Sequence, residues 1–445
     1  MTKKYHRVII SLHLLSRRVI SRGNPMNQNT APSLASLYVE THESSSDARF
    51  TSPFMQGFPA EPHRRVTWHN WMRPPFNQWG FRNLARLRPS IDVQAGAGPA
   101  SVLRQTPQAL DELHFNSECG LSISVIEHLV ASQTDAFLVM QGDTVLFERY
   151  FNGQAPQDRH VMFSVTKSLI GTLGEQLVSE GVLDPALPAA HYVPEFEGSA
   201  YADATVRQLF DMAVGIHYSE VYEDPDSESS QYGYACGFQP APAQYAQFES
   251  LYQFLPSLRK QGEHGGFFHY VTATTEALAW VMERASGKAS HHLLEEVWSQ
   301  LGCERDGYFM ADPWGRSVAG AGFNATLRDM ARFGRLLAND GRHQGRQLLS
   351  PETVARIAAG ADPAIYATSP DFEAWTPGAS YRSQWYVFND HSQALMAGGI
   401  HGQYLFVDKP SGVVIVKQSS LNEAVSPFDG DSVRMLRAIA AHLGD

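Results

Sequence analysis

The stretch VMFSVTKSLIGTL, residues 161–173, places Ser164 and Lys167 three positions apart at the start of an apolar run. Residues with this spacing share one face of a helix, so their side chains would be neighbours. A serine becomes a nucleophile when a neighbour accepts its proton, and a lysine can accept one if burial or a helix N-terminus lowers its pKa. The pair is therefore a candidate nucleophile and base. The alternative is a serine that caps the helix beside a lysine that extends to solvent.

The surroundings of Lys167 favour the first interpretation, because apolar residues flank it on both sides and lysine is rarely buried without a partner. A second pair with the same spacing, Ser257 and Lys260, lacks this setting. The polar segment QGEHGG follows it directly. We expect the second pair to lie on the surface.

Composition and charge exclude several classes of function. The 445 residues carry a net charge of −11, which disfavours nucleic acid as a partner because phosphate binding needs a basic surface. No apolar stretch approaches the roughly 20 residues that span a bilayer, so we expect no membrane association and a cytoplasmic location. Three cysteines without zinc or disulfide spacing, and HHLLEE at 291–296 read as a surface helix, predict no metal and no cofactor.

The chain is expected to fall into three parts. Residues 1–50 are polar and expected to be poorly ordered, and Met26 is an alternative start beyond an upstream extension. Residues 51–110 are rich in proline, arginine and aromatic residues and should form an arm that packs its Trp and Phe side chains on the main body. Residues 111–445 should form the main domain, with a helical insertion over 175–330.

Regular patterns in this main domain predict an α+β fold. DAFLVMQGDTVLFERYF is typical of two strands joined by a Gly-Asp turn, and further strands are predicted in SQWYVFND, QALMAGG and QYLFVDKPSGVVIVKQS. Helices are predicted in SLIGTLGEQLVSEG, TATTEALAWVMERASGK, NATLRDMARFGRLLANDG and SVRMLRAIAAHLG, the third capped by Asn324 or Thr326. Strands precede and follow the helices, which favours an antiparallel sheet flanked by helices with a separate helical subdomain.

Two further segments follow the Ser164 motif in order. Tyr270 lies just before a predicted helix in FFHYVTATTEALAW, and GGIHGQYLFVDKPSG, residues 398–412, lies between two predicted strands. Ser-x-x-Lys is the nucleophile motif of penicillin-binding proteins and serine β-lactamases. The ordered set resembles the class C β-lactamases and related esterases, in which Tyr-x-Asn and then Lys-Thr-Gly or His-x-Gly follow the serine motif.

Together with MQGFPAEPHRRVTWHNWMRPPFNQWGFRN and DMAVGIHYSEVYEDPDSE, the set resembles the 6-aminohexanoate-dimer (nylon oligomer) hydrolases over residues 50–445. The resemblance implies a β-lactamase/penicillin-binding-protein-like fold. It implies Ser164 as the acylating nucleophile, Lys167 as its proton acceptor, and Tyr270, with a pKa lowered by the nearby lysine, as the acid or base that serves the leaving group. It also implies an oxyanion hole formed by the backbone N–H groups of Ser164 and Gln403.

Two departures from the class C pattern bear on the substrate. Thr272 stands in place of the Asn of Tyr-x-Asn, and Ile400, followed by His401 and Gly402, stands in place of the lysine of Lys-Thr-Gly. That lysine helps to hold the carboxylate of a β-lactam, so its loss favours linear amides or esters. His401 is expected to donate a hydrogen bond beside the substrate, with Ile400 and Gly402 lining the same subsite.

The segment YSEVYEDPDSESS, residues 218–230, gathers Glu220, Glu223, Asp224, Asp226 and Glu228. It is either a solvated acidic loop or a lid whose charge attracts an ammonium group on the substrate. In the second case Tyr218 or Tyr222 would donate a hydrogen bond to the substrate amide, and we prefer Tyr218.

The sequence therefore predicts a serine hydrolase that cleaves a small-molecule amide or ester through an acyl-Ser164 intermediate, with a homodimer as its expected assembly. Three alternatives remain open: a β-lactamase or D,D-peptidase of the same fold, a carboxylesterase without amidase activity, and a non-catalytic binding protein that keeps the pocket.

Overall fold

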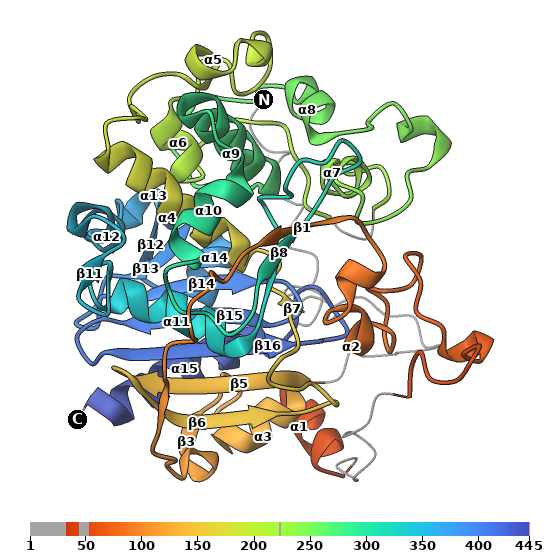
Figure 1. Cartoon of the computed structure of the whole chain (residues 1–445), viewed down its shortest axis with the longest axis vertical. Coiled ribbons are helices and arrows are strands. Elements are labelled where there is room, and N and C mark those ends of the chain that lie inside the picture. Colours follow the sequence, from red (N-terminus) through yellow and green to blue (C-terminus); the bar gives the residue numbers. More distant parts are fainter. Residues whose placement is uncertain (1–32, 44–52, 222–223, 445) are drawn as a thin grey trace, which may run out of the picture.

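Figure 1 shows the computed structural model of this chain, in which a large sheet carries helices on both faces. The structure describes residues 33–43, 53–221 and 224–444. The main sheet has eight strands and is antiparallel except for one parallel pair, β2 with β6. The predicted α+β fold is confirmed. In spatial order the strands are β12 (Ala379–Arg382), β13 (Trp385–Phe388), β14 (Leu395–Gly399), β15 (Gln403–Asp408), β16 (Val413–Ser419), β5 (Thr134–Gln141), β6 (Thr144–Tyr150) and β2 (Arg104–Gln105).

The central strands are buried on both faces because each face has its own helical layer. Side chains alternate along a strand, so Leu138 and Met140 of β5 join the core under α11 (Leu327–Ala338), whereas Phe137 and Val139 face the opposite core. That opposite core is closed by α3 (Val125–Ala131) and α15 (Asp429–Gly444). The middle of β5 and the first half of β16 are therefore entirely apolar.

A second sheet leads the chain into the Ser164 motif. It has four strands in the order β1 (Ser90–Val93), β8 (Gly307–Met310), β9 (Phe323–Ala325) and β7 (His160–Val161). β7 ends three residues before Ser164. Two hairpins complete the strands, β3 (His114–Asn116) with β4 (Ser122–Ser124), and β10 (Arg342–His343) with β11 (Arg346–Gln347).

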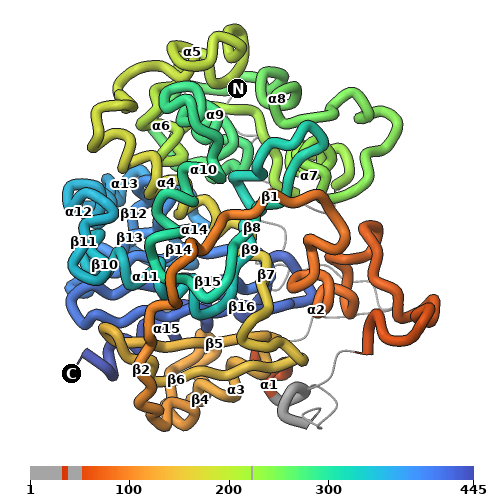
Figure 2. Tube along the Cα trace, viewed as in Figure 1, coloured from red at the N-terminus to blue at the C-terminus, as the bar shows by residue number. Residues whose placement is uncertain are grey.

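Most remaining helices form a layer beyond the sheet, as the tube in Figure 2 shows. The chain leaves the main body after α4 (Val165–Ser179), passes through this layer, and returns through β8 and β9 to α11. The helices of the layer are α5 (Ala189–Tyr192), α6 (Val206–Phe210), α7 (Glu228–Ala235), α8 (Leu251–Phe254), α9 (Thr272–Ser286) and α10 (Ser290–Trp298). Three more follow α11, namely α12 (Pro351–Ala358), α13 (Pro363–Tyr366) and α14 (Pro370–Trp375).

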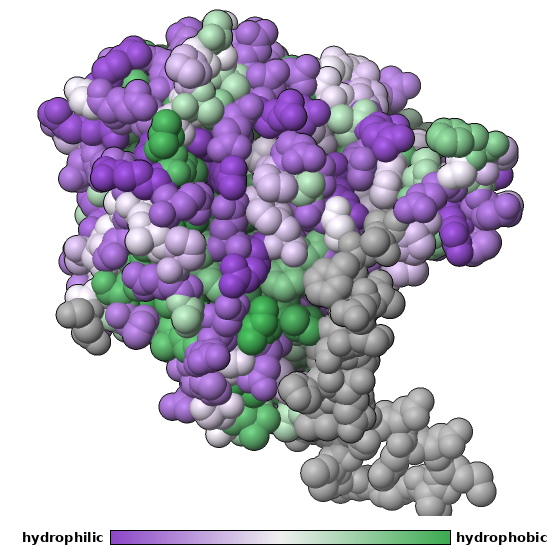
Figure 3. All heavy atoms as spheres, turned by 60° about the horizontal axis from the view of Figure 1, so that its bottom comes forward, coloured by the Kyte–Doolittle hydropathy of each residue, from purple (hydrophilic) through white to green (hydrophobic). Residues whose placement is uncertain are grey.

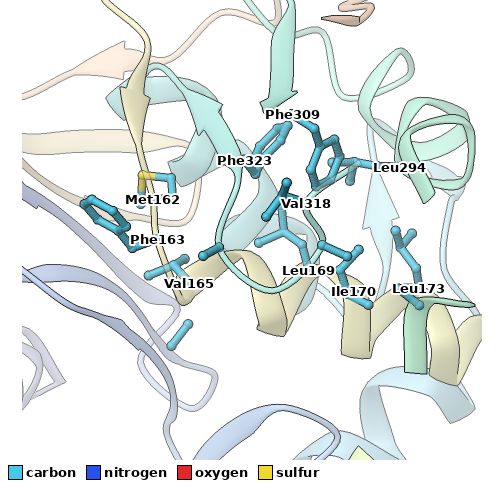
Figure 4. Close-up of a cluster of buried hydrophobic side chains, with 14 of the residues drawn as sticks. Met162, Phe163, Val165, Leu169, Ile170, Leu173, Leu294, Phe309, Val318 and Phe323 are labelled. Carbon is cyan, nitrogen blue, oxygen red and sulfur yellow. The ribbon is translucent and has the colours of Figure 1, made fainter. Parts of the chain in front are cut away.

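Helix α4 is the central support of the molecule. Its apolar residues pack with side chains from β8, β9 and α10, as Figure 4 shows for Leu169, Ile170 and Leu173. Gly171 allows the closest approach, because a Cβ at this position would lie 2.0 Å from the backbone oxygen of Ser383. The helix therefore holds its first turn, which carries Ser164 and Lys167, rigidly in the core.

The N-terminal part of the chain contributes to the cores. Trp71, Trp79 and Phe81 of the arm are buried, whereas Phe58 is fully exposed. The described part of the arm contains the short α-helix α2 (Asn77–Gly80) and 3₁₀ turns at Pro62–Arg64 and Leu84–Arg86. Within the stretch 1–50, which we expected to be poorly ordered, the structure places a helix, α1 (Leu34–Glu43), whose Tyr38 hydroxyl donates to Asp431 over 2.9 Å. Tyr38 thus attaches this helix to α15, and the rest of 1–50, including Met26, lies outside the described residues.

The individual elements agree with their sequence patterns. Gly142 and Gly287 adopt the positive φ values that the predicted turn and helix end require, and Thr326 caps α11 by accepting from the Asp329 backbone. Figure 3 shows hydrophilic residues over most of one face, with apolar patches between them. No helix in the described part of the chain combines the length and apolar character needed to cross a membrane.

Candidate active site

Ser164 lies at the sharp turn between β7 and α4. Phe163, directly before it, has φ +43°, in the left-handed region that a bulky residue rarely adopts. Three rings pack around Phe163 and hold this backbone in place: Trp71 stacks on it, Phe81 meets it edge to face, and His401 lies beside it. The turn leaves Ser164 partly exposed at the N-terminal end of α4.

Lys167 lies within hydrogen-bonding distance of Ser164. Its Nζ is 2.8 Å from Ser164 Oγ and 2.7 Å from the backbone oxygen of Gly320, and only 1% of the residue is exposed. Burial lowers the pKa of Lys167 to about 8, against the opposing effect of the carboxylates of Glu220 and Glu276. A substantial fraction of this lysine is therefore neutral near physiological pH.

Tyr270 completes the cluster from the segment before α9. The Lys167 Nζ lies 5.2 Å from the centre of its ring, and the ring of Phe372 in α14 stacks with it at 5.3 Å between centroids. The expected lowering of its pKa was wrong. Burial and the Glu220 carboxylate raise the pKa of Tyr270 well above its ordinary value, although the Ser164 side chain works in the opposite direction. The phenol is therefore protonated at neutral pH.

Glu220 brings a carboxylate to the same place. Its Oε1 accepts from the backbone N–H and the hydroxyl of Thr272, at 3.0 and 3.1 Å, at the first turn of α9. A negative charge is favourable there because unpaired N–H groups gather at a helix N-terminus. Thr272, in place of the Asn of the class C motif, thus anchors Glu220. The sequence pattern placed Glu220 only in an acidic loop and gave no signal for this contact.

The end of β14 forms the other side of Ser164. A Cβ on Gly399 would lie 3.1 Å from the backbone nitrogen of Ser164 and 3.3 Å from the Cβ of Gln403. Ser164 and Gln403 thus both lie next to Gly399, and their role as oxyanion donors stays a prediction. Ile400 is half-buried at the turn that follows, and Gly402 is buried with φ +83°.

His401 is not where the sequence analysis placed it. Its ring is 5% exposed, its Nδ1 donates to the backbone oxygen of Leu421 over 2.7 Å, and it packs against Phe81 and Phe163. It therefore supports the Ser164 turn from the core side rather than facing a substrate. Burial lowers the pKa of His401 to about 4, so the ring is neutral at physiological pH.

This burial predicts acid-sensitive stability. The unfolded histidine takes up a proton near pH 6.5 and the folded one only near pH 4, so protonation favours unfolding as the pH falls between these values, by about 3 kcal/mol in total. His401→Asn tolerates the φ of +60° at this position and takes up no proton. At pH 7.5 it should unfold at a lower temperature than the wild type, because it loses ring contacts, and this difference should shrink at pH 4.5. Thermal unfolding followed by circular dichroism measures both; an equal difference at the two pH values would contradict the assignment.

The acidic segment forms local contacts. Glu228 accepts from the Ser219 backbone and pairs with His217 at 2.9 Å, and Asp226 accepts from the Tyr245 hydroxyl at 2.9 Å. Tyr222 and Glu223 lie outside the described residues. Tyr218 is half-buried and packs against the main core.

Ser257 and Lys260, the second pair with the same spacing, each bind a different partner. Ser257 Oγ donates to the backbone oxygen of Phe254 over 2.6 Å, and Lys260 pairs with Asp203 at the surface. In the HHLLEE helix, His291 contacts Ser317 over 3.0 Å. No group of three or more metal-binding side chains occurs in the described ranges.

Comparisons with known proteins agree with this architecture. The family model described as Beta-lactamase matches residues 123–440. The chain is 34% identical over 381 residues to a 6-aminohexanoate-dimer hydrolase of Paenarthrobacter ureafaciens, covering 84% of this chain and 93% of the relative. It resembles the solved "Putative 6-aminohexanoate-dimer hydrolase from Bacillus anthracis" with a TM-score of 0.78 and 29% identity, over 85% of this chain and 97% of the other. EstCE1, described as a hydrolase with promiscuous acyltransferase activity, shares the fold with a TM-score of 0.53 and 15% identity, over 68% and 94% of the two chains.

Proposed function

This chain belongs to the beta-lactamase family and is a serine hydrolase, and on that premise we propose that it hydrolyses linear amides through an ester formed on Ser164. The observation that carries this proposal is the contact of 2.8 Å between Ser164 Oγ and the buried Nζ of Lys167. The relative that is 34% identical over 381 residues is named 6-aminohexanoate-dimer hydrolase.

In the proposed acylation, Lys167 is the base. In its neutral form Nζ accepts the proton of the Ser164 hydroxyl while Oγ attacks the amide carbon. The Gly320 oxygen, 2.7 Å from Nζ, orients the amine toward the serine. Because the pKa of Lys167 is about 8, the neutral fraction and hence the acylation rate rise with pH up to that value and level off above it.

We assign the proton of the leaving amine to Tyr270. Its raised pKa keeps the phenol protonated, so the hydroxyl can donate to the amine nitrogen as the C–N bond breaks and can be reprotonated from the Lys167 side. Water then attacks the acyl-Ser164 ester, with the same groups returning the proton to Ser164.

The developing oxyanion is proposed to bind between α4 and the turn after β14. The Ser164 N–H points from the first turn of α4, where the helix dipole favours negative charge. Gly399 keeps the space beside this N–H free of a side chain. Gln403 remains the proposed second donor.

A linear amide is favoured over a β-lactam because Ile400, not a lysine, stands where class C enzymes bind the carboxylate of the antibiotic. Tyr218 is the proposed hydrogen-bond donor to the substrate amide. Its segment reaches the site directly, since Glu220, two residues on, binds Thr272. A cytoplasmic location is proposed because all three cysteines are free thiols, as expected in a reducing compartment.

A substrate comparison tests this proposal. The purified protein is assayed with the linear dimer of 6-aminohexanoate, a p-nitrophenyl ester and the β-lactam nitrocefin, and acyl-enzyme is mapped by peptide mass spectrometry after quenching. We expect turnover of the amide, an acyl group on Ser164, and kcat/KM for nitrocefin at least about 100-fold lower than for the amide. Turnover of the ester alone would identify a carboxylesterase, efficient nitrocefin turnover would contradict the role given to Ile400, and a stable acyl-enzyme without turnover would identify a binding protein.

A further inference from the structure

Behind Lys167 lies a second buried ionic cluster, centred on Glu276 of α9. We propose that Glu276 is a positioning residue of the amide hydrolysis, which holds Gly320 against Lys167 and supplies a buried negative charge near the base. This inference rests on the proposed role of Lys167.

The contacts form a continuous chain from Glu276 to the base. Glu276 Oε1 accepts from the backbone N–H of Gly320 over 2.7 Å, and the carbonyl oxygen of Gly320 accepts from Lys167 Nζ over 2.7 Å. A Cβ at Gly320 would lie 2.9 Å from the Thr272 side chain and 3.1 Å from Glu276 Oε1. A single peptide unit is thus clamped between the carboxylate and the lysine.

Glu276 is held in its ionised form. It is completely buried, which raises the pKa of its carboxyl group, but every polar group directed at it is a donor. A carboxylate accepts hydrogen bonds, and charged acceptors form the stronger ones. The donors are Gly320 N, Ala319 N at 3.2 Å, the Tyr232 hydroxyl at 3.0 Å and Arg316 Nη1 at 2.9 Å.

The other ionisable groups near this cluster do not replace Glu276. Lys167 is faced by Glu220 from the 218–220 segment, by Tyr270, and by Glu276. Around Glu276 itself lie Arg316, Tyr232 and the Cys236 thiol. Glu220 raises the pKa of Lys167 more than Glu276 does, but it is partly exposed to solvent screening. Its carboxylate accepts from Thr272, whereas Gly320 donates to Glu276. Glu276 opposes the effect of burial on Lys167 and so keeps the base from losing its proton at too low a pH.

Glu276→Gln tests this role through the pH dependence of acylation, measured by stopped-flow with a p-nitrophenyl ester. In the wild type the acylation rate should rise with pH and level off near pH 8. We call this rise the limb of the pH profile, and the constant rate above it the plateau. The variant has lost the carboxylate, so its limb should move to lower pH by roughly half a unit or more. Its plateau rate should fall several-fold, because the new amide nitrogen faces the donors Ala319 N–H and Arg316.

Two further variants separate charge from structure. Glu283 lies on the same helix as Glu276, and its carboxylate is 3.7 Å from Arg316 Nε. Glu283→Gln removes this carboxylate and should leave the limb unchanged. Glu276→Asp keeps the charge but not the reach to Gly320, so it should restore the limb while the plateau stays several-fold low. If Glu276→Gln does not fold, Glu276→Asp remains as the test. This variant must have a thermal midpoint above the assay temperature, and its plateau rate should be several-fold lower than that of the wild type.

The outcomes are distinct from those for the proposed function. An unmoved limb in Glu276→Gln, an equal shift in Glu283→Gln, or a wild-type plateau in Glu276→Asp would overturn the role of Glu276. A wild-type rate without a limb near pH 8 would instead remove Lys167 as the base and leave the Glu276 cluster a structural one.

Discussion

Ser164→Ala is expected to abolish covalent labelling by a fluorophosphonate and to lower kcat/KM for a linear amide by about 10⁴-fold or more. The reason is that Oγ is the proposed atom that forms the acyl bond, and it lies 2.8 Å from the Nζ of the proposed base, Lys167. The backbone at this position is fixed by the Phe163 cluster and by α4, so the fold should persist. Label stoichiometry is read by intact mass and its position by peptide mapping.

Ser257→Ala is the matched control. It removes a serine with the same spacing to a lysine, but Ser257 Oγ only closes a local turn onto Phe254. Labelling and turnover should equal those of the wild type. Residual labelling of Ser164→Ala at another site, together with unchanged turnover, would show that the nucleophile is a different residue.

Lys167→Met should lower the acylation rate by about 10²- to 10⁴-fold, the range that general-base catalysis contributes. Methionine fills the same buried space without a group that can accept a proton, and it leaves the oxygen of Gly320 without its donor. The rate that remains should no longer change between pH 7 and 9, because the group that titrates near pH 8 has been removed. Stopped-flow acylation across this pH range measures both effects.

Lys260→Met provides the control, because Lys260 forms only a surface ion pair with Asp203, and such pairs contribute little. Its acylation rate and pH limb should match the wild type. A Lys167→Met enzyme that keeps both the wild-type rate and the limb would exclude Lys167 as the base. A variant that melts below the assay temperature is replaced by Lys167→Gln, for which the same loss is expected.

The parts of the site that the sequence predicted are those with local signatures. Ser164 and Lys167 are adjacent through helix geometry alone, and an apolar run around a lysine shows its burial directly. Tyr270 required the order of several motifs, since nothing within its own segment distinguishes it from a core tyrosine. Strand alternation and helix caps gave the elements, including Thr326 at the start of α11.

What the sequence did not reveal depends on contacts between distant segments. His401 was assigned to the substrate from its place in a motif, but its Nδ1 finds Leu421 on another segment. The raised pKa of Tyr270 follows from the burial provided by α14 and from Glu220. Glu276 did leave a signal, a lone carboxylate in the apolar helix TATTEALAWVM, whose meaning depends on Arg316 and Gly320.

The position of the arm has a consequence for how this protein is made. Trp71 leaves the ribosome before its partners do. Its ring stacks on Phe163, and its Nε1 donates to the backbone oxygen of Phe238, which is 167 residues further along the chain. The contact of Asn77 forms later still, because its side-chain amide donates to the backbone oxygen of Ser420, 343 residues downstream. During translation the arm therefore exposes its aromatic rings until most of the chain has emerged, and such surfaces are prone to aggregate or to bind chaperones. Trp71 and Asn77 are therefore synthesised well before the downstream residues that fix them in place.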